Sequence, residues 1–391
     1  MMSKKYLVAC TAACALLLCT TSALAGTAQR ETHGDREFRV YTPDGNVAGK
    51  PVFVVLHGCT QSADDIADAS RIDALADEKG FVAIYPEQTS TQGLNRCWEW
   101  WDVANQKRDS GEPKEIADGV ATIVDAHGLD HERVYVAGIS AGGAMSVVLG
   151  ATYPDRFAAI GVLAGAEYEA ATALSGVYAA TSGGGPDPKK QGQRAHDAMG
   201  SFARVVPVMI FHGDADGVVA PVNGEQVMAQ WLSTNTLVLG DGTIADATKS
   251  DGEAGYAYTR TVLASKEKGG SVVEHFLVKG LGHAWPGGKA GGSFADAKGP
   301  DASRTLWTFF EKRTLSQPIP DGPTADPEPA PGESTPASSS GSSSSPSSSS
   351  SNDGGGCAMT PNRGIASSSV AIAAALAVLQ LRRLNRRKRR D

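Results

Sequence analysis

Residues 134–143 read VYVAGISAGG, and this stretch constrains the fold more than any other part of the sequence. An apolar run ends at Gly138, Ser140 lies between two glycines spaced G-x-S-x-G, and a segment of small apolar residues follows. This order predicts a strand, a sharp turn that carries Ser140, and a helix. Gly138 and Gly142 lack the side chains that would keep such a strand and helix apart. The stretch therefore predicts an exposed nucleophilic serine.

Short apolar runs alternate with amphipathic segments along the chain. The runs that predict strands are 51–56, 81–85, 133–137, 158–163, 207–211 and 272–278. Residues 65–78 and 113–126 carry apolar side chains at helical spacing, and Pro113 suits the first turn of a helix. Buried strands that alternate with helices predict a mostly parallel sheet flanked by helices on both faces. Together with the turn at Ser140, this pattern predicts the α/β class and an α/β-hydrolase fold.

The beginning of the chain has the composition of a targeting segment. Residues 1–25 contain two lysines, an apolar run and a final Ala-Leu-Ala, which predict a secretory signal peptide cleaved after Ala25. A lipoprotein signal at Cys14 or Cys19 is a weaker alternative, because Cys19 follows a bulky leucine and Cys14 lies early in the apolar run. We therefore expect an exported protein whose folded domain occupies residues 26–314.

The end of the chain has the composition of a linker and a tail. Residues 315–356 are rich in Pro and acidic residues and then in Ser, which predicts a disordered linker. Residues 357–391 begin at a Gly-Cys pair and contain a short apolar run, 365–381, before an Arg-rich end. This tail resembles the C-terminal sorting signals of myxobacteria, which implies processing or membrane anchoring with the domain left outside. An ordinary tail anchor or a weakly structured basic tail is the alternative.

Export bears on whether the cysteines of the domain are expected to be paired or free. Once residues 1–25 are removed, only Cys59 and Cys97 remain in the predicted domain, and two such cysteines in an exported protein favour one disulfide. Two buried thiols are the alternative. The net charge is −7 although the last ten residues are mostly basic, so the domain itself is acidic and nothing indicates nucleic-acid binding.

A serine nucleophile needs a general base, and the base needs an orienting carboxylate. In the predicted fold the acid and then the histidine follow the serine along the chain. The run 207–211 leads into HGDADGVV, where the H-G-x-x-D-x-x-V spacing of many esterases with this fold favours Asp216, while Asp214 is expected to structure the turn. His283 lies in a glycine-rich loop after the last predicted strand, whereas His275 lies within that strand on a packed face. The expected triad is therefore Ser140, Asp216 and His283.

The negative charge of a tetrahedral intermediate needs two N–H donors held in place. The amide of Ala141, directly after the serine, is one candidate donor. The loop after the run 51–56 reads HGCTQ and supplies the other, for which Cys59 is well placed. An ordinary turn with a structural cysteine is the alternative for this loop.

Tryptophans gather near the predicted site in the sequence. Trp100 and Trp101 follow Cys97, and Trp285 lies two residues after His283, so these three are candidate substrate-binding residues. Trp98 and Trp307 are expected in the core instead.

Several segments of this chain match one known family in a consistent order over residues 36–310. They are LHGCTQ, ADEKGFVAIYPEQ, NRCWEWWD, VYVAGISAGGAM, YPDRFAAIGVLAG, PVMIFHGDADGVV, GHAWPGG and GPDASRTLWTFF. They resemble the esterase family that includes polyhydroxybutyrate depolymerases, feruloyl and acetylxylan esterases, and the LpqC-like lipoproteins. The resemblance implies the triad named above, a Cys59–Cys97 disulfide, and an exported carboxylic-ester hydrolase that needs no metal and no cofactor.

We therefore expect an extracellular or surface-exposed monomeric serine esterase that acts on ester substrates through an acyl-enzyme. A feruloyl or acetylxylan esterase is the main alternative to a hydroxyalkanoate esterase. A non-catalytic binding module and a serine peptidase are minor alternatives. Depolymerases that attack crystalline polyester usually carry a separate substrate-binding domain, whereas the linker here leads to the tail, which argues against attack on solid polyester and leaves small or soluble esters open as substrates.

Overall fold

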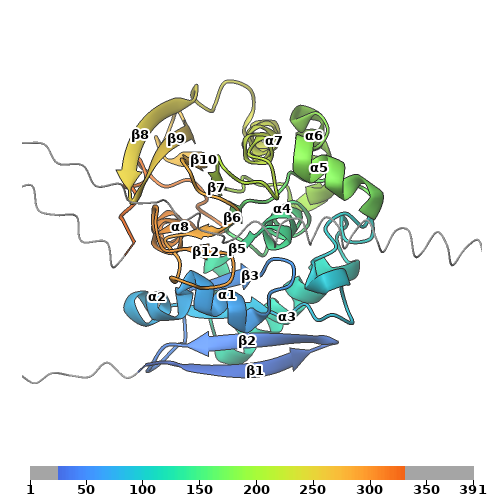
Figure 1. Ribbon diagram of the computed structural model, residues 1–391, viewed down its shortest axis with the longest axis vertical. Helices are drawn as coiled ribbons and strands as arrows, with labels where there is room; N and C mark the ends of the chain where they lie inside the picture. Colours follow the sequence, from blue (N-terminus) through green and yellow to red (C-terminus); the bar gives the residue numbers. More distant parts are fainter. Residues whose placement is uncertain (1–24, 331–391) are drawn as a thin grey trace, which may run out of the picture.

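The computed structural model describes residues 25–330, which fold around a ten-stranded sheet (Figure 1). The strand order is β1-β2-β4-β3-β5-β6-β7-β10-β9-β8. The predicted signal peptide, the tail at 357–391 and the linker beyond residue 330 lie outside the described residues. No helix within residues 25–330 is long and apolar enough to span a membrane.

The centre of the sheet consists of parallel strands, and these are the runs that the apolar pattern predicted. They are β4 (Val82–Pro86), β3 (Val52–Leu56), β5 (Val134–Ile139), β6 (Ala159–Leu163), β7 (Val208–Gly213) and β10 (Ser271–Val278). Parallel strands need both faces covered, which explains why these runs are mainly apolar, although β10 also carries the buried Glu274 and His275. The expected α/β-hydrolase fold is confirmed.

Antiparallel strands extend the sheet at both edges. β1 (Thr27–His33) and β2 (Arg36–Thr42) add to β4, while β9 (Tyr256–Ala264) and β8 (Thr248–Ala254) add to β10. A separate two-stranded sheet pairs β11 (Trp285–Pro286) with β12 (Ala295–Asp296). The outer strands β1 and β8 are largely exposed, so they lack the apolar runs that revealed the central strands.

Helices cover both faces of the sheet. One apolar core includes α3 (Gly111–His127), α4 (Ala141–Thr152), α6 (Pro188–Met199) and α7 (Val222–Leu239). The other includes α1 (Ala63–Ser70), α2 (Ile72–Lys79) and α8 (Ala302–Phe310). Successive residues of β3 alternate between the two cores, with Val54 in the first and Phe53 and Val55 in the second. A short helix, α5 (Val177–Gly183), lies beyond the sheet.

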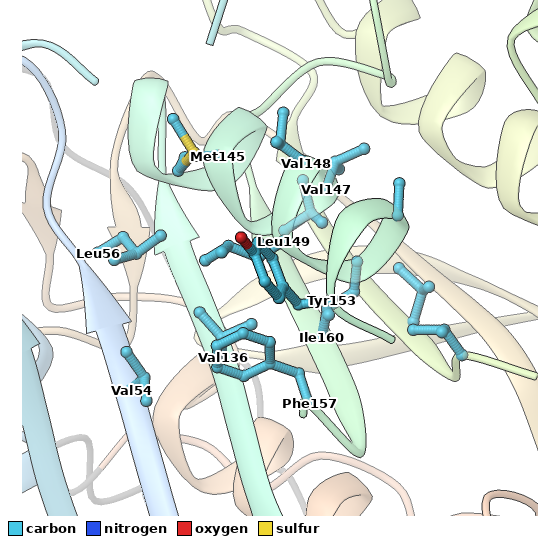
Figure 2. Close-up of a cluster of buried hydrophobic side chains, with 14 of the residues drawn as sticks. Val54, Leu56, Val136, Met145, Val147, Val148, Leu149, Tyr153, Phe157 and Ile160 are labelled. Carbon is cyan, nitrogen blue, oxygen red and sulfur yellow. The ribbon is translucent and has the colours of Figure 1, made fainter. Parts of the chain in front are cut away.

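The helix that follows Ser140 is buried along its whole length. All residues of α4 are buried, and Figure 2 shows Met145 and Leu149 among side chains that include Leu56 and Val136 from the neighbouring strands. A helix that is apolar on every side must be buried on every side. The core therefore fixes the position of the turn that precedes α4.

The amphipathic segment predicted at 65–78 forms two helices rather than one. α1 ends and α2 begins at Arg71, which has a left-handed backbone with φ +60°. Both helices face the same core through Ile66, Ile72 and Leu75, so the apolar spacing continues across the break. The pattern therefore located the helical segment correctly but contained no signal for the kink.

The domain extends beyond the boundary that composition predicted at residue 314. Ile319 and Thr324 are buried, the Thr324 hydroxyl lies 2.9 Å from that of Ser271, and Arg260 donates to the Thr324 carbonyl at 3.1 Å. Arg260 also pairs with Asp326 at 2.7 Å. Residues 315–330 thus pack against β9 and β10, and the assignment of a disordered linker starting at 315 is corrected for this segment.

The two ends of the described chain meet beside α2. The amide of Gly26 donates to Asp77 at 3.1 Å, while Arg304 of α8 pairs with Glu78 and has its Nε 3.8 Å from Glu328. The first and the last described residues therefore lie near one corner of the domain.

We expect a chain that ends at Thr314 to be less stable than one that ends at Ala330. Truncation exposes the apolar surface under Ile319 and removes the partners of Ser271 and Arg260. Burial of one such side chain contributes about 1.5–3 kcal/mol, so the Tm should fall by about 2–5 °C. Thermal unfolding of the two purified chains, both starting at Gly26, measures this; equal Tm values contradict it.

Candidate active site

Ser140 lies at the turn between β5 and α4, in a conformation that only close packing of backbones can maintain. Its φ is 59° and its ψ is −122°, and its amide donates to the Leu163 carbonyl at 2.9 Å. A Cβ on Gly142 would lie 2.4 Å from the Leu56 carbonyl oxygen, and one on Gly138 would lie 2.5 Å from the Gly142 backbone. Both glycines of the G-x-S-x-G motif are therefore required by the approach of α4 to β3 and β5.

Asp216 and His283 form a directly bonded pair. The Nδ1 atom of His283 lies 2.7 Å from Oδ2 of Asp216. The amides of Val218 and Val219 donate to Oδ1 at 2.8 Å and 2.9 Å, so the carboxylate is fixed by its own loop. Burial by itself would raise the pKa of the Asp216 carboxyl. The hydrogen bond with His283, the charge of His283 and the hydrogen bonds from these two amides outweigh burial and keep the pKa of Asp216 below its ordinary value. The pair therefore holds an ionised acid against the histidine ring.

Two further groups near this pair have structural partners. The Nε2 atom of His212 lies 2.9 Å from the Val219 carbonyl, and burial lowers the pKa of its ring, so it is neutral beside Asp216. Asp214 accepts from the Gly280 amide at 2.7 Å and lies 3.6 Å from Lys279. Asp214 thus structures the turn, as the sequence indicated.

The loop after β3 borders the serine. The Cys59–Cys97 disulfide is present and joins this loop to the segment that carries the tryptophans. A Cβ on Gly58 would lie 3.4 Å from the Cβ of Ser140. In the part of the chain that the structure describes, the amides of Cys59 and Ala141 donate to no backbone or side-chain acceptor. Two free amides therefore flank the serine.

A cavity of about 210 Å³ brings the predicted residues together. Ser140, His283, Cys59 and Ala141 all line it, and Asp216 reaches it through His283. Its further lining is mainly apolar and includes Trp100, Trp101, Ala144, Ala166, Leu174, Val177, Tyr178, Val219 and Phe294. Trp100 and Trp101 therefore border the cavity as expected, although each is mostly covered by neighbouring residues.

Backbone strain gathers around this cavity. Thr60, Asn95, Ser140, Ala164 and Phe294 all line it and all have positive φ between 45° and 69°, without being glycine. Such conformations cost on the order of 1–3 kcal/mol each and persist where the surrounding structure enforces them. The strain lies where chemistry is expected.

Trp285 does not reach the cavity, which corrects its assignment as a substrate-binding residue. Its ring is fully buried, and its Nε1 donates to the Ser303 hydroxyl at 3.0 Å. The β11–β12 pairing turns this residue toward α8. Trp285 therefore does not line the cavity, although it lies only two residues from His283 in the sequence. Trp98 and Trp307 are buried, as expected.

α5 adds a wall to the cavity, within the Gly- and Ala-rich segment 165–199, whose sequence is compatible with a cover over the cleft but does not indicate what it selects. Tyr178 is 70% exposed, lines the cavity and is the most exposed large apolar side chain of the described residues. Residues 165–199 contain little beyond Gly, Ala and polar residues that would have distinguished a cavity wall from a loop. The aromatic residue at 178 was the available signal.

Glu167 lies buried behind this wall without a partner. Neither carboxyl oxygen has a hydrogen-bond partner among the described residues. Oε1 lies so close to Gly185 that a Cβ on that glycine would be 2.5 Å from it. Burial, assisted by the charge of Asp187, raises the pKa of Glu167 to about 8. The side chain is therefore mostly protonated at neutral pH.

Within residues 25–330, the His, Cys, Asp and Glu side chains form no group of three or more that would hold a metal ion. The chemistry available at this cavity is that of a serine hydroxyl, a histidine oriented by a carboxylate, and two free amides.

Comparisons with known proteins point to one family. A family model described as Esterase PHB depolymerase matches residues 37–254. Poly(3-hydroxyalkanoate) depolymerase C of Paucimonas lemoignei is 31% identical over 255 residues, which are 65% of this chain and 59% of that protein. This chain thus spans less than two thirds of that relative.

Feruloyl and acetylxylan esterases are similar as well. Feruloyl esterase B of Thermothelomyces thermophilus is 29% identical over 255 residues, covering 62% of this chain and 82% of that protein. Acetylxylan esterase A of Emericella nidulans is 31% identical over 206 residues, covering 50% and 66%. Among solved structures, an acetyl xylan esterase from Aspergillus awamori shares the fold, with a TM-score of 0.55, 24% identity, and coverage of 66% of this chain and 94% of that one.

We expect Glu167→Gln to stabilise the protein at pH 8 and to change little at pH 4. The carboxyl group ionises near pH 4.5 in the unfolded chain but only near pH 8 in the folded one, so stability is lost as pH rises through this interval. A glutamine stays neutral and avoids that loss. Thermal unfolding at both pH values measures the difference, with Glu253→Gln on the exposed strand β8 as the control. Equal Tm gains at pH 4 and pH 8 contradict the expectation.

Proposed function

The chain belongs to the Esterase PHB depolymerase family, and we propose that it is an exported serine esterase that cleaves carboxylic esters through an acyl-enzyme. The observation that carries the proposal is the shared cavity of Ser140 and His283, with Asp216 bonded to His283 at 2.7 Å. The hydrogen bond with Asp216 uses Nδ1 of the His283 ring, which leaves Nε2 to accept the proton of Ser140. The strained backbone at Ser140 is typical of a nucleophile at such a turn.

In the proposed reaction, Ser140 Oγ attacks the ester carbonyl carbon while its proton passes to Nε2 of His283. The tetrahedral intermediate collapses, the ester C–O bond breaks, and His283 gives that proton to the departing alcohol. Water then attacks the acyl carbon and passes a proton to His283. Collapse releases the carboxylic acid and returns the proton to Ser140.

Two groups stabilise the charges that develop during these steps. Asp216 holds the tautomer of His283 and stabilises the imidazolium, while its own charge is secured by the amides of Val218 and Val219. The amides of Cys59 and Ala141 are free to bind the oxyanion. Donors that are already in place when the charge appears lower the barrier without reorganisation.

We propose a hydroxyalkanoate ester as the substrate, because the depolymerase from Paucimonas lemoignei is among the relatives at 31% identity and the cavity lining is mainly apolar. The aromatic lining, with Trp100, Trp101 and Tyr178, also favours a feruloyl ester, and feruloyl esterase B relatives support that second candidate. The predicted signal peptide and tail would place the enzyme outside the cell or at its surface.

The first test compares ester release by the wild-type domain and by Ser140→Ala. We expect wild type to release hydroxybutyrate from soluble oligomers, and Ser140→Ala to lose activity by a factor of about 10⁴ or more with an unchanged Tm.

Methyl ferulate and acetylated xylan are offered in parallel, and preference for either would identify the second class of substrate. A fluorophosphonate probe that fails to label Ser140 would support a binding module, and faster cleavage of a peptide anilide than of the matching ester would support a peptidase.

Asp216→Asn and Asp214→Asn form a matched pair that tests the acid. We expect Asp216→Asn to lower kcat by about 10³–10⁴, because an amide no longer stabilises the imidazolium or fixes the productive tautomer. Asp214→Asn keeps an oxygen for the Gly280 amide and should stay within about threefold of wild type. Steady-state kinetics on a p-nitrophenyl ester decide; similar losses in both variants would show that neither carboxylate has the proposed special role.

A further inference from the structure

His57 is a buried histidine that the reaction above does not use. It follows β3 directly and precedes the loop that carries Cys59. The backbone amide of Gln88 lies 3.0 Å from its Nε2, and the Gly58 carbonyl oxygen lies 2.8 Å from its Nδ1. A backbone N–H can only donate, so Nε2 is the acceptor and Nδ1 carries the proton. The ring therefore donates one hydrogen bond, to Gly58.

This hydrogen bond determines which way the next amide points. The carbonyl oxygen and the following N–H of a trans peptide point in opposite directions, and no described peptide bond is cis. The Gly58 carbonyl turns toward His57 and also accepts from the Gln61 amide at 3.3 Å. The N–H of Cys59 must then point away from His57. Cys59 lines the cavity with Ser140, and its amide has no other acceptor among the described residues.

We propose that His57 is a positioning residue, which aims the Cys59 amide at the oxyanion by holding the Gly58 carbonyl turned away from it. The inference rests on the proposed function, since it concerns the oxyanion of the same reaction. If this peptide rotated by half a turn, a carbonyl oxygen would face the developing negative charge in place of a donor. The hydrogen bond from His57 opposes that rotation.

The surroundings of His57 keep its ring in one place and one protonation state. Burial lowers the pKa of His57 to about 4, so the neutral ring persists at ordinary working pH. The ring lies 5.4 Å from that of Trp98, whose Nε1 donates to the His57 carbonyl at 3.0 Å. Arg36 lies over Trp98 and donates to the Gln88 side chain at 2.8 Å. The ring of His57, which donates to Gly58, is thus held in place by Gln88 and by Trp98.

Two amide substitutions separate the two nitrogens of the ring. His57→Asn places an N–H near the position of Nδ1 and can still donate to Gly58. His57→Gln extends its amide toward the position of Nε2 and leaves Gly58 without that donor. With p-nitrophenyl butyrate, we expect His57→Gln to lower kcat by about 10–100-fold with KM within about twofold of wild type, and His57→Asn to recover most of the loss.

A buried histidine elsewhere controls for simple loss of packing. His275 is buried in β10, and its Nε2 has no hydrogen-bond partner among the described residues. We expect His275→Gln to keep kcat within about twofold of wild type. A trifluoromethyl ketone that forms a hemiketal with Ser140 should lose affinity for His57→Gln by about the same factor as kcat/KM, because both depend on the oxyanion.

Equal kcat values for His57→Asn and His57→Gln, or an effect confined to KM, would overturn the proposal. A crystal structure of the wild-type protein after fluorophosphonate labelling tests it without any substitution. The proposal expects the phosphonyl oxygen at the Cys59 amide and an intact His57–Gly58 hydrogen bond; a broken bond overturns it. Absence of labelling at Ser140, by contrast, would reject the proposed function itself.

Discussion

The whole arrangement depends on how closely the backbone of α4 approaches the backbone of β3. A single added carbon at Gly142 would lie 2.4 Å from the Leu56 carbonyl and 2.6 Å from that of His57. This contact brings the serine turn beside the loop that leaves β3, and the apolar burial of α4 holds it there. The geometry of the candidate site and the packing of the core are therefore one constraint: a change that loosens either one moves Ser140 relative to the amides of Cys59 and Ala141.

The sequence predicted the parts of the fold that depend on burial on both sides. The central parallel strands are mainly apolar because helices cover both faces, so their pattern survives in the sequence. The outermost strands β1 and β8 are largely exposed and left no such pattern. Residues 315–330 looked like linker from their prolines and acidic residues, yet a few buried contacts through Ile319 and Thr324 hold them on the sheet. Composition averages over such contacts and cannot reveal them.

The residues of the candidate site also fall into two groups: those that their order along the chain predicted and those that it did not. Ser140, Asp216 and His283 follow an order along the chain that the fold itself imposes, so sequence position was sufficient to select them. Trp285 was chosen by its nearness to His283 in the sequence, but the direction of a side chain depends on local pairing, and β11 turns this ring into the core. His57 begins the loop HGCTQ, but the Gln88 amide that fixes its tautomer lies 31 residues away, and Glu167 differs from other glutamates by having no hydrogen-bond partner among the described residues; the sequence shows neither feature.

The meeting of the chain ends beside α2 has a mechanical consequence. Figure 1 shows α2 and α5 on opposite sides of the molecule, and α5 forms a wall of the cavity. A tether attached at either end of the described chain therefore leaves from the side of the molecule opposite α5. Immobilised on a bead through either end of the described chain, or inserted into a loop of a host protein, the domain would keep its α5 side, with that wall of the cavity, turned toward the solution.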